Sequence, residues 1–256
     1  MTESLESRFR AAKASGHKLL VPYMTGGLRG WQDAVRAAAA NGADAIEIGL
    51  PFSDPVIDGP VIQRASQLAL ANGATPVSVL DEVRTLDVGI PLAVMTYYNT
   101  VHHAGHERFA NQPAAAGIAA AIVPDLPLEE SGPWCTAADL AHVETIMLAA
   151  PTASDERLHR VVARCRGFVY SVGVLGVTGE RDELASTAVV LAARLLAITD
   201  LPVLVGVGVS SAAQAAQAVA VADGVVQGAS VVRRLLEEGP DAVGRYVAEV
   251  RARIDG

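Results

Sequence analysis

The stretch AIEIGLPFSDPVIDGPVIQ, residues 45–63, shows the unit from which the whole chain is built. It opens with a short apolar run at residues 45–49 and continues into a loop bounded by prolines. Similar apolar runs recur roughly every 25 to 30 residues, and amphipathic stretches lie between them. This alternation predicts repeated βαβ units, and therefore an α/β protein with a parallel sheet.

Eight apolar runs fit this pattern, at residues 18–23, 45–49, 92–97, 119–123, 145–149, 168–172, 202–207 and 224–228. Eight strands alternating with helices favour closure into a barrel. The alternative is an open, doubly wound sheet, but no GxGxxG motif follows the first run. We therefore predict a (β/α)8 TIM barrel, formed by residues 1–256 as a single domain.

The predicted helices carry recognisable start signals. Thr75 and Pro76 precede VSVLDEV as a cap and a first-turn proline, and Ser154 precedes DERLHRVVARC. An extra amphipathic helix, Leu5–Ala14, comes before the first strand. We expect it to cover the floor of the barrel.

Composition argues against several classes of function. The net charge of −8, without any run of Lys and Arg, argues against nucleic-acid binding. The first ten residues hold no apolar run, and no uninterrupted apolar stretch reaches the length of about 18 residues that a membrane span needs. We expect a cytoplasmic protein. Cys135 and Cys165 lack CxxC spacing, so we expect small buried side chains rather than a disulfide or metal ligands.

Two carboxylates beside the second predicted strand are the candidate catalytic groups. Glu47 stands between Ile46 and Ile48, so alternation along the strand points its carboxyl into the barrel mouth if the isoleucines face the helices. Asp58 follows in a loop held by prolines and a glycine, which can bring it over the same mouth. A buried ion pair and a turn residue are the alternative interpretations. Together, at the carboxyl end of a barrel strand, the pair favours acid-base catalysis.

Glycine clusters follow the last three predicted strands, at residues 176–179, 206–208 and 228–230. Glycine lets backbone N–H groups approach an anion, and the helix after Gly228 adds the positive end of its dipole. Loops after strands seven and eight form the usual phosphate site of barrels. The clusters therefore predict a phosphate ligand, with tight turns as the alternative use.

Lysine and histidine usage argues against two further mechanisms. The only lysines, Lys13 and Lys18, precede or enter the first strand, so neither should reach the mouth to form a Schiff base. His102 and His106 are spaced like one helical turn, with His103 between them, but no third metal ligand is evident. We expect these histidines to be solvated and the site to hold no metal.

The segment AIEIGLPFSDPVIDGPVIQRAS closely resembles the signature of the tryptophan synthase alpha chain family. The motifs VPYMT, MTYYN, IVPDLPLEES, FVYSVGVLGVTG and GVGVSSAAQ support the resemblance in the same order. The resemblance covers nearly the whole chain, and the PFSDPxxDGP element is specific. It implies a lyase of tryptophan biosynthesis that cleaves indole-3-glycerol phosphate to indole and glyceraldehyde 3-phosphate without a cofactor.

The resemblance also implies roles for single residues. Glu47 and Asp58 match the family's two catalytic acids. The substrate-binding positions that follow from the resemblance and from the predicted pocket are Tyr23, Tyr97, Ile122, Tyr170, Thr178, Gly179, Gly206, Gly208, Gly228 and Ala229. The resemblance further implies that Asp54 and Pro55 contact a beta chain in an alpha2-beta2 heterotetramer.

The chain departs from the family pattern at two places. Gly26, Gly27, Leu28, Arg29 and Gly30 replace the family's usual turn after the first strand. Ala229 stands where the family has a serine, and Ser230 follows it. The alternatives to the alpha-chain function are a stand-alone lyase that releases free indole, a non-catalytic barrel that activates a partner, and a phosphosugar isomerase. Intact acids disfavour the second alternative, and an apolar, Tyr-lined pocket disfavours the third.

Overall fold

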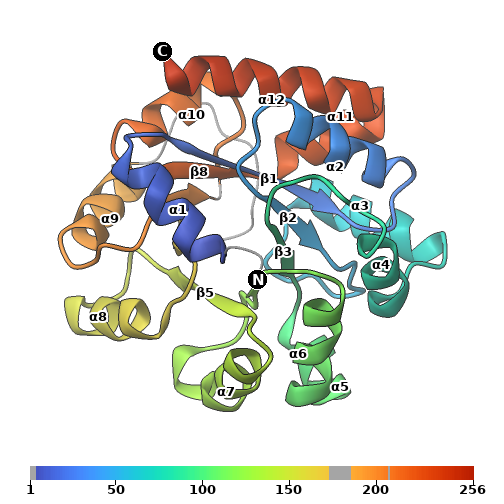
Figure 1. Ribbon diagram of the computed structural model, residues 1–256, viewed down its shortest axis with the longest axis horizontal. Coiled ribbons are helices and arrows are strands. Elements are labelled where there is room, and N and C mark those ends of the chain that lie inside the picture. The colour runs from blue at the N-terminus through green and yellow to red at the C-terminus, as the bar shows by residue number, and fades with distance from the viewer. Residues whose placement is uncertain (1–3, 173–185, 207) are drawn as a thin grey trace.

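A closed barrel of parallel strands forms the centre of the computed structural model, which describes residues 4–172, 186–206 and 208–256 (Figure 1). The strands follow one another around the barrel in chain order, and β8 pairs with β1. Their bounds are β1 Leu19–Thr25, β2 Ile46–Gly49, β3 Leu92–Met95, β4 Ala120–Ile122, β5 Glu144–Ala149, β6 Val169–Val172, β7 Val203–Gly206 and β8 Gly224–Gln227. The predicted TIM barrel is confirmed, with strand ends shifted by one or two residues.

Helices surround the barrel on its outside (Figure 1). Their bounds are α1 Leu5–Ala14, α2 Trp31–Ala40, α3 Pro60–Ala71, α4 Pro76–Val83, α5 Tyr98–Ala104, α6 His106–Ala115, α7 Gly132–Leu140, α8 Asp155–Arg164, α9 Ser186–Leu196, α10 Ala212–Val219, α11 Ala229–Glu238 and α12 Pro240–Asp255, with a short 3-10 helix η1 at Leu128–Glu130. The predicted caps are confirmed: the side chain of Thr75 accepts from Ser78 N, and that of Ser154 accepts from Arg157 N.

The last strand approaches the first very closely. Leu19 pairs with Gly224, and a Cβ on Gly224 would lie 2.4 Å from the Leu19 carbonyl oxygen. Only glycine fits there, because backbone cannot move aside as a flexible side chain can. Strands β1, β2, β3, β7 and β8 are buried along their whole length, as expected for strands enclosed by helices.

Helix α1 crosses the barrel opening that faces the viewer in Figure 1. Its backbone N–H at Glu6 donates to the Glu144 carboxylate at 3.0 Å, and Phe9 stacks on Phe168 with ring centroids 5.8 Å apart. Both partners lie at the amino-terminal ends of strands. The prediction that Leu5–Ala14 covers the floor is therefore confirmed.

The lysines also lie at the floor. Lys13 Nζ is 3.0 Å from the Asp223 carboxylate, and Lys18 Nζ donates to the Ala222 carbonyl at 2.9 Å. These partners precede β8, at the end of the barrel opposite the mouth. The expected positions of the lysines are confirmed, so neither reaches the mouth.

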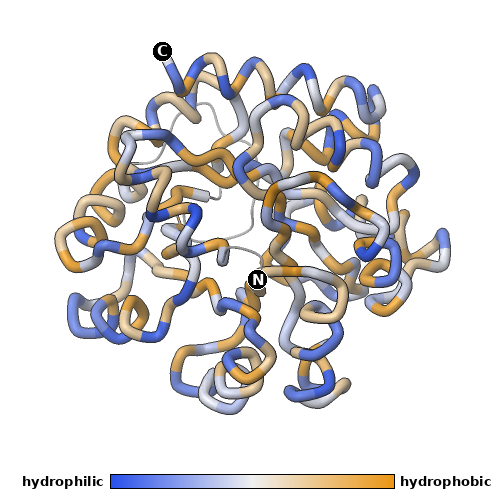
Figure 2. The backbone as a smooth tube through the Cα atoms, viewed as in Figure 1, coloured by the Kyte–Doolittle hydropathy of each residue, from blue (hydrophilic) through white to orange (hydrophobic). Residues whose placement is uncertain are grey.

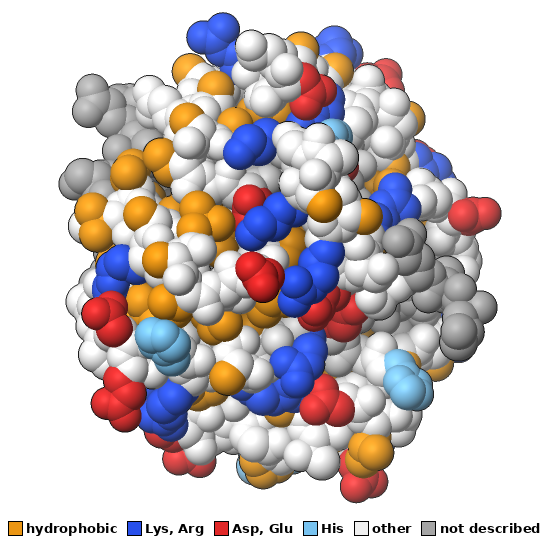
Figure 3. Space-filling view, turned by 60° about the vertical axis from the view of Figure 1, so that its left-hand side comes forward, with side chains coloured by type: hydrophobic (Ala, Val, Ile, Leu, Met, Phe, Trp, Pro, Cys, Tyr) orange, Lys and Arg blue, Asp and Glu red, His pale blue; other side chains and the backbone are white. Residues whose placement is uncertain are grey.

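Most apolar residues lie inside the structure and most charged residues lie on its surface. Apolar segments concentrate in the strands and on the inner faces of the helices, while polar segments face outward (Figure 2). On the face in Figure 3, Lys and Arg are interspersed with Asp and Glu. Arg157 and Glu129 form one ion pair, at 2.7 Å. Cys135 and Cys165 are buried free thiols, as expected. Within the described ranges, none of the helices combines the length and apolar character that crossing a bilayer requires.

Candidate active site

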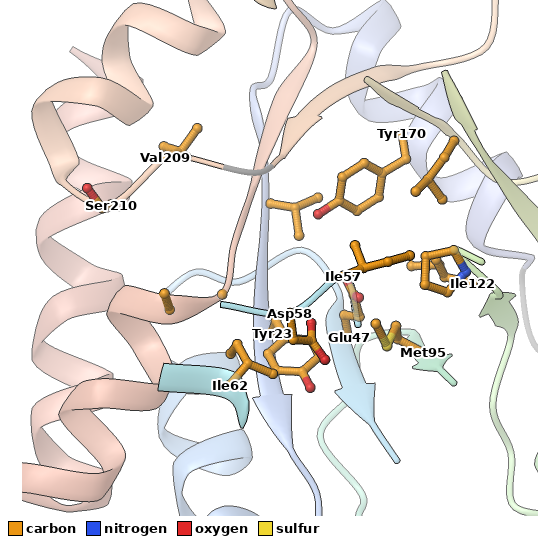
Figure 4. Close-up of a pocket in the computed structure, with 16 residues that line it drawn as sticks. Tyr23, Glu47, Ile57, Asp58, Ile62, Met95, Ile122, Tyr170, Val209 and Ser210 are labelled. Carbon is orange, nitrogen blue, oxygen red and sulfur yellow. The ribbon is translucent and has the colours of Figure 1, made fainter. Parts of the chain in front are cut away.

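A mostly apolar pocket opens at the carboxyl ends of the strands, the end opposite α1. It is lined by Tyr23, Glu47, Ile57, Asp58, Ile62, Met95, Ile122, Pro124, Leu148, Tyr170, Gly208, Val209, Ser210, Val226, Gly228 and Ala229. Figure 4 shows the Glu47 and Asp58 carboxyls near Tyr23, with Tyr170 across the pocket. Active sites of TIM barrels occupy this end.

Strand β2 carries Glu47 into this pocket. The flanking Ile46 and Ile48 are fully buried against the surrounding structure, so alternation turns Glu47 inward, as the sequence predicted. The Glu47 side chain is 4 % exposed, and its Oε2 has no hydrogen-bond partner among the described residues. Burial, and then the nearby charge of Asp58, raise the pKa of Glu47 to about 8. Glu47 therefore holds its proton at neutral pH.

The loop between β2 and α3 holds Asp58, which is 7 % exposed. Its backbone N–H donates to the Pro55 carbonyl at 3.1 Å, and Gln63 Nε2 donates to its carbonyl at 2.8 Å. Burial raises the pKa of Asp58 to about 6, and a hydrogen bond with Tyr97 opposes this rise. Asp58 is therefore largely ionised at neutral pH, whereas Glu47 is neutral.

The surroundings of Glu47 distinguish between its two interpretations, a catalytic acid-base group and a buried ion pair. An ion pair would need a cation beside the carboxylate, but within residues 4–172, 186–206 and 208–256 no Lys or Arg side chain pairs with Glu47. A buried carboxyl without a cation or a complete set of hydrogen bonds costs stability, and such groups concentrate at functional sites. The geometry favours acid-base chemistry over a structural ion pair.

Tyr97, which was expected on the pocket wall, hydrogen-bonds the side chain of Asp58. It is absent from the lining residues, its hydroxyl accepts from Ile57 N at 3.2 Å, and its ring stacks on Phe52 with centroids 5.1 Å apart. Its contacts therefore support the segment that carries Asp58. Tyr97 lies beyond the end of β3 and directly before α5, so strand alternation does not determine the direction of its side chain.

The apolar wall contains residues that the sequence analysis did not select. Tyr23, Ile122 and Tyr170 line the pocket as expected, and so do Met95 and Leu148. Strand register gave a usable signal for these two: Met95 lies two residues beyond Ala93, the partner of Glu47, and Leu148 lies two beyond Ile146, the partner of Ile122. Residues two apart in a strand share a face.

The backbone segments that follow β7 and β8 form the opposite side of the pocket. Gly208, Val209 and Ser210 follow β7, while Gly228 and Ala229 lead into α11. Backbone N–H groups near a helix N-terminus suit an anion, although the Ser210 N–H already donates to Gln214 Oε1 at 2.7 Å. Gly206 lies beneath instead, since a Cβ on it would be 2.3 Å from the Tyr170 hydroxyl. Thr178 and Gly179, with the predicted cluster at residues 176–179, fall outside the described residues.

The turn that departs from the family pattern is shaped by packing. A Cβ on Gly26 would lie 2.4 Å from Val79 Cγ1, and one on Gly27 would lie 2.4 Å from Ala74 Cβ. Gly27 and Gly30 also have φ angles of 80° and 77°, which favour glycine. Helix α4 and the segment between α3 and α4 therefore approach this turn closely, and its glycines are needed for that contact.

The three neighbouring histidines do not share a helix. Helix α5 ends at Ala104 and α6 begins at His106, so the inferred one-turn spacing of His102 and His106 is wrong; Gly105, with φ 85°, separates them. His106 Nε2 lies 3.0 Å from the Tyr98 hydroxyl. Across the described part of the chain, no group of three or more His, Cys, Asp or Glu side chains could hold a metal ion.

Comparisons with known proteins agree with this geometry. The family model described as tryptophan synthase alpha chain matches residues 9–253. The tryptophan synthase alpha chain of Streptomyces coelicolor is 44% identical over 245 residues, covering 94% of this chain and 90% of the relative. That of Thermobifida fusca is 44% identical over 244 residues, covering 93% and 90%.

Solved structures give the same result. A chain of Mycobacterium tuberculosis tryptophan synthase superimposes with a TM-score of 0.90 at 37% identity, covering 98% of this chain and 97% of that one. Tryptophan synthase subunit alpha from Legionella pneumophila gives a TM-score of 0.87 at 31% identity, covering 99% of each chain.

The pKa of Glu47 predicts how stability depends on pH. The folded protein retains the Glu47 proton up to about pH 8, whereas an ordinary glutamate releases it near 4.5, so rising pH favours the unfolded state between these values. Glu47→Gln has no such loss. Its free energy of unfolding should exceed that of the original protein by an amount that grows across this window, reaching on the order of 2–5 kcal/mol. Urea denaturation at intervals of pH measures this difference.

Glu237→Gln, the same exchange at an exposed position of α11, supplies the baseline for that measurement. A difference between the Glu47→Gln variant and the original protein that stays flat from pH 4.5 to 8 would show that burial does not hold the proton on Glu47.

Proposed function

The chain belongs to the tryptophan synthase alpha chain family, and we propose that the pocket at its barrel mouth cleaves indole-3-glycerol phosphate to indole and glyceraldehyde 3-phosphate. The protein is a lyase and serves as the alpha subunit in L-tryptophan biosynthesis. The stand-alone lyase is not favoured. We also propose that the reaction needs no cofactor and that residues 1–256 form one domain acting in the cytoplasm.

The observation that carries this proposal is the pair of buried carboxyls with separated pKa values. Glu47, with a pKa of about 8, can supply a proton at neutral pH, and Asp58, with a pKa of about 6, can accept a hydrogen bond as a carboxylate. Pairs of acids whose environments separate their pKa values commonly divide the roles of acid and base in this way.

The proposed reaction uses both groups. Glu47 donates its proton to C3 of the indole ring, and positive charge develops on the ring nitrogen. Asp58 accepts a hydrogen bond from the ring N–H and stabilises that charge. Glu47, now a carboxylate, takes the proton of the side-chain hydroxyl. The O–H electrons form the aldehyde C=O, the C–C bond breaks, and its electrons return to the ring. The hydroxyl proton has replaced the one that Glu47 gave to C3, so the acid is ready for another cycle.

The pocket walls suit the two ends of this substrate. Tyr23, Ile122 and Leu148 offer an apolar surface for an indole ring. The phosphate would lie against Gly208 and Gly228, where α11 begins and its dipole favours negative charge. Ala229 has no hydroxyl to offer, so the proposed phosphate contacts are made by backbone N–H groups.

We propose a beta chain as the macromolecular partner, in an alpha2-beta2 heterotetramer. Asp54 is exposed, Pro55 is half-buried, and the neighbouring Val56 is 72 % exposed. An exposed apolar side chain beside a charged one is typical of a contact surface. The same loop carries Asp58, so docking against Asp54 and Pro55 would act directly on the segment that holds this acid.

Substitution of either acid tests the proposed reaction. Glu47→Gln keeps the shape of the side chain but removes proton transfer, so indole release should fall about 10³-fold. Asp58→Asn removes the charge facing the ring nitrogen and should lower turnover at least roughly a hundredfold. The measurement is single-turnover indole release from indole-3-glycerol phosphate, with melting temperatures recorded on the same preparations.

A matched control for the acids is Glu144→Gln, at the barrel floor, where burial also raises the pKa of a carboxyl. This variant should retain normal indole release. A folded Glu47→Gln protein with near-normal cleavage would sink the proposed mechanism.

Gly228→Val tests the phosphate position. A Cβ on Gly228 meets no atom closer than 3.8 Å, at Tyr23, so the first carbon of a side chain fits, and the methyl groups of valine would project beside a pocket residue. KM should rise at least roughly tenfold while kcat changes little, since the acids stay in place. Gly208 is less suited to this test because its φ of 91° already disfavours valine. Steady-state kinetics measure both constants.

Gly132→Val supplies the control, because Gly132 faces open space outside the pocket. An unchanged KM in folded Gly228→Val would place the phosphate elsewhere.

Asp54→Ala tests partner coupling. Basal cleavage should persist because Asp58 remains, while the rise in turnover on adding a tryptophan synthase beta chain should fall at least roughly tenfold. Indole release with and without the beta chain measures this ratio. Asp87→Ala removes an exposed carboxylate just before β3, at the floor, and should leave the ratio unchanged. Full activation of Asp54→Ala would argue against docking at this loop.

A further inference from the structure

A buried hydrogen-bond network centres on Tyr246 of the last helix, α12. Tyr246 is 3 % exposed. Its hydroxyl accepts from Gln227 Nε2 at 3.0 Å, donates to the Ser210 carbonyl at 3.3 Å and lies 3.2 Å from Ser230 Oγ. The Arg234 guanidinium lies over the ring, 3.7 Å from its centroid. The phenol is thus fixed from its edge and its face.

The three contacts of this hydroxyl come from three different segments. Ser210 belongs to the loop after β7, Gln227 is the last residue of β8, and Ser230 lies in the first turn of α11. Gln227 Nε2 also lies 3.4 Å from the Ser211 carbonyl, and Arg234 donates to the Ser230 carbonyl at 2.8 Å. One side chain therefore joins the β7 loop to the start of α11.

These joined segments are the ones that form the backbone side of the pocket. Ser210 lines the pocket itself, and Ser230 directly follows the lining residues Gly228 and Ala229. Among the described residues, the pairing of β7 with β8 ends at Val205 and Val225, before either loop begins. The sheet therefore does not fix the two loops relative to each other, whereas the Tyr246 hydroxyl contacts both.

The serine that follows Ala229 takes part in this network. Ser230 is fully buried, and its hydroxyl contacts Tyr246 rather than lining the pocket. In place of a hydroxyl one position earlier, this chain has a serine that helps to hold the backbone.

We propose that Tyr246 is a positioning residue for the phosphate end of the substrate, acting through Ser210 and Ser230. The inference rests on the proposed function, because it assigns the phosphate to these two loops. Backbone donors bind an anion well only when they are held at fixed positions, since otherwise binding must first order them. Removing the hydroxyl breaks the direct link between Ser210 and Ser230 and loosens the position of one loop relative to the other. Glu47 and Asp58, on the other side of the barrel mouth, are unaffected.

Tyr246→Phe tests this role. The phenyl ring keeps its packing beneath Arg234, but the three hydroxyl contacts are lost. KM for indole-3-glycerol phosphate and the inhibition constant of glycerol 3-phosphate should each rise about threefold to tenfold. The affinity for indole, which has no phosphate, and kcat should stay unchanged. A purely structural role would lower stability without separating these constants.

Tyr98→Phe is the matched control, because it also removes a hydroxyl contact, to His106 outside the pocket, and should leave all four constants unchanged. Ser230→Ala breaks the same network from its other side and should reproduce the effect of Tyr246→Phe. The variant that carries both substitutions should bind glycerol 3-phosphate as tightly as the weaker-binding single variant does. Both substitutions break the same contact, so their effects should not add.

The outcomes separate the two proposals. If the original protein binds glycerol 3-phosphate but Tyr246→Phe and Ser230→Ala bind it equally well, the positioning role is wrong and the proposed function stands. If Tyr246→Phe does not fold, Ser230→Ala alone decides in the same way. If the original protein neither binds glycerol 3-phosphate nor releases indole, the proposed function falls, and the positioning role falls with it.

Discussion

The pairing of β1 with β8 closes the barrel, and both ends of the molecule depend on this closure. It brings the first strand beside residues about 200 positions later, as in the pair Val21 with Val226. A closed sheet has no free edge, so its interior is filled by side chains and only the ends of the strands remain open for chemistry. Tyr23 and Gly228 can therefore face one pocket although they lie at opposite ends of the chain.

Closure also determines the electrostatics of the mouth. A carboxyl at the end of a closed, apolar barrel loses water that no described cation replaces, so Glu47 stays protonated at neutral pH. Asp58 enters from a loop and keeps a hydrogen bond to Tyr97, so its pKa rises less. The difference between the acids follows from their positions on strand and loop. The protein keeps this unfavourable burial of Glu47 at the proposed site, where proteins commonly accept such a cost.

Much of the fold could be predicted from the sequence because its signals are local. Alternation of side-chain direction along residues 45–50 directs Glu47 inward, and Thr75 and Ser154 mark the starts of α4 and α8 as N-cap residues. The site was less predictable where it depends on how far a side chain reaches. The Tyr97 hydroxyl reaches Ile57 and Asp58 in the loop after β2, and Gly206 packs against Tyr170. The contacts of Tyr246 with Ser210 and Ser230 join segments 36 and 16 residues apart, and no local pattern marks such a meeting.

The docking of α1 across the floor has a consequence for synthesis on the ribosome. This helix precedes every strand of the barrel along the chain, but the groups that bind it, Glu144, Gly167 and Leu201, lie 138, 161 and 188 residues beyond their partners. A helix of ten residues is marginally stable alone. Its apolar residues Leu5 and Phe9 therefore lack their native contacts while most of the chain is being synthesised. The apolar face of this segment therefore stays uncovered until β5 and the residues that precede β6 and β7 have been made.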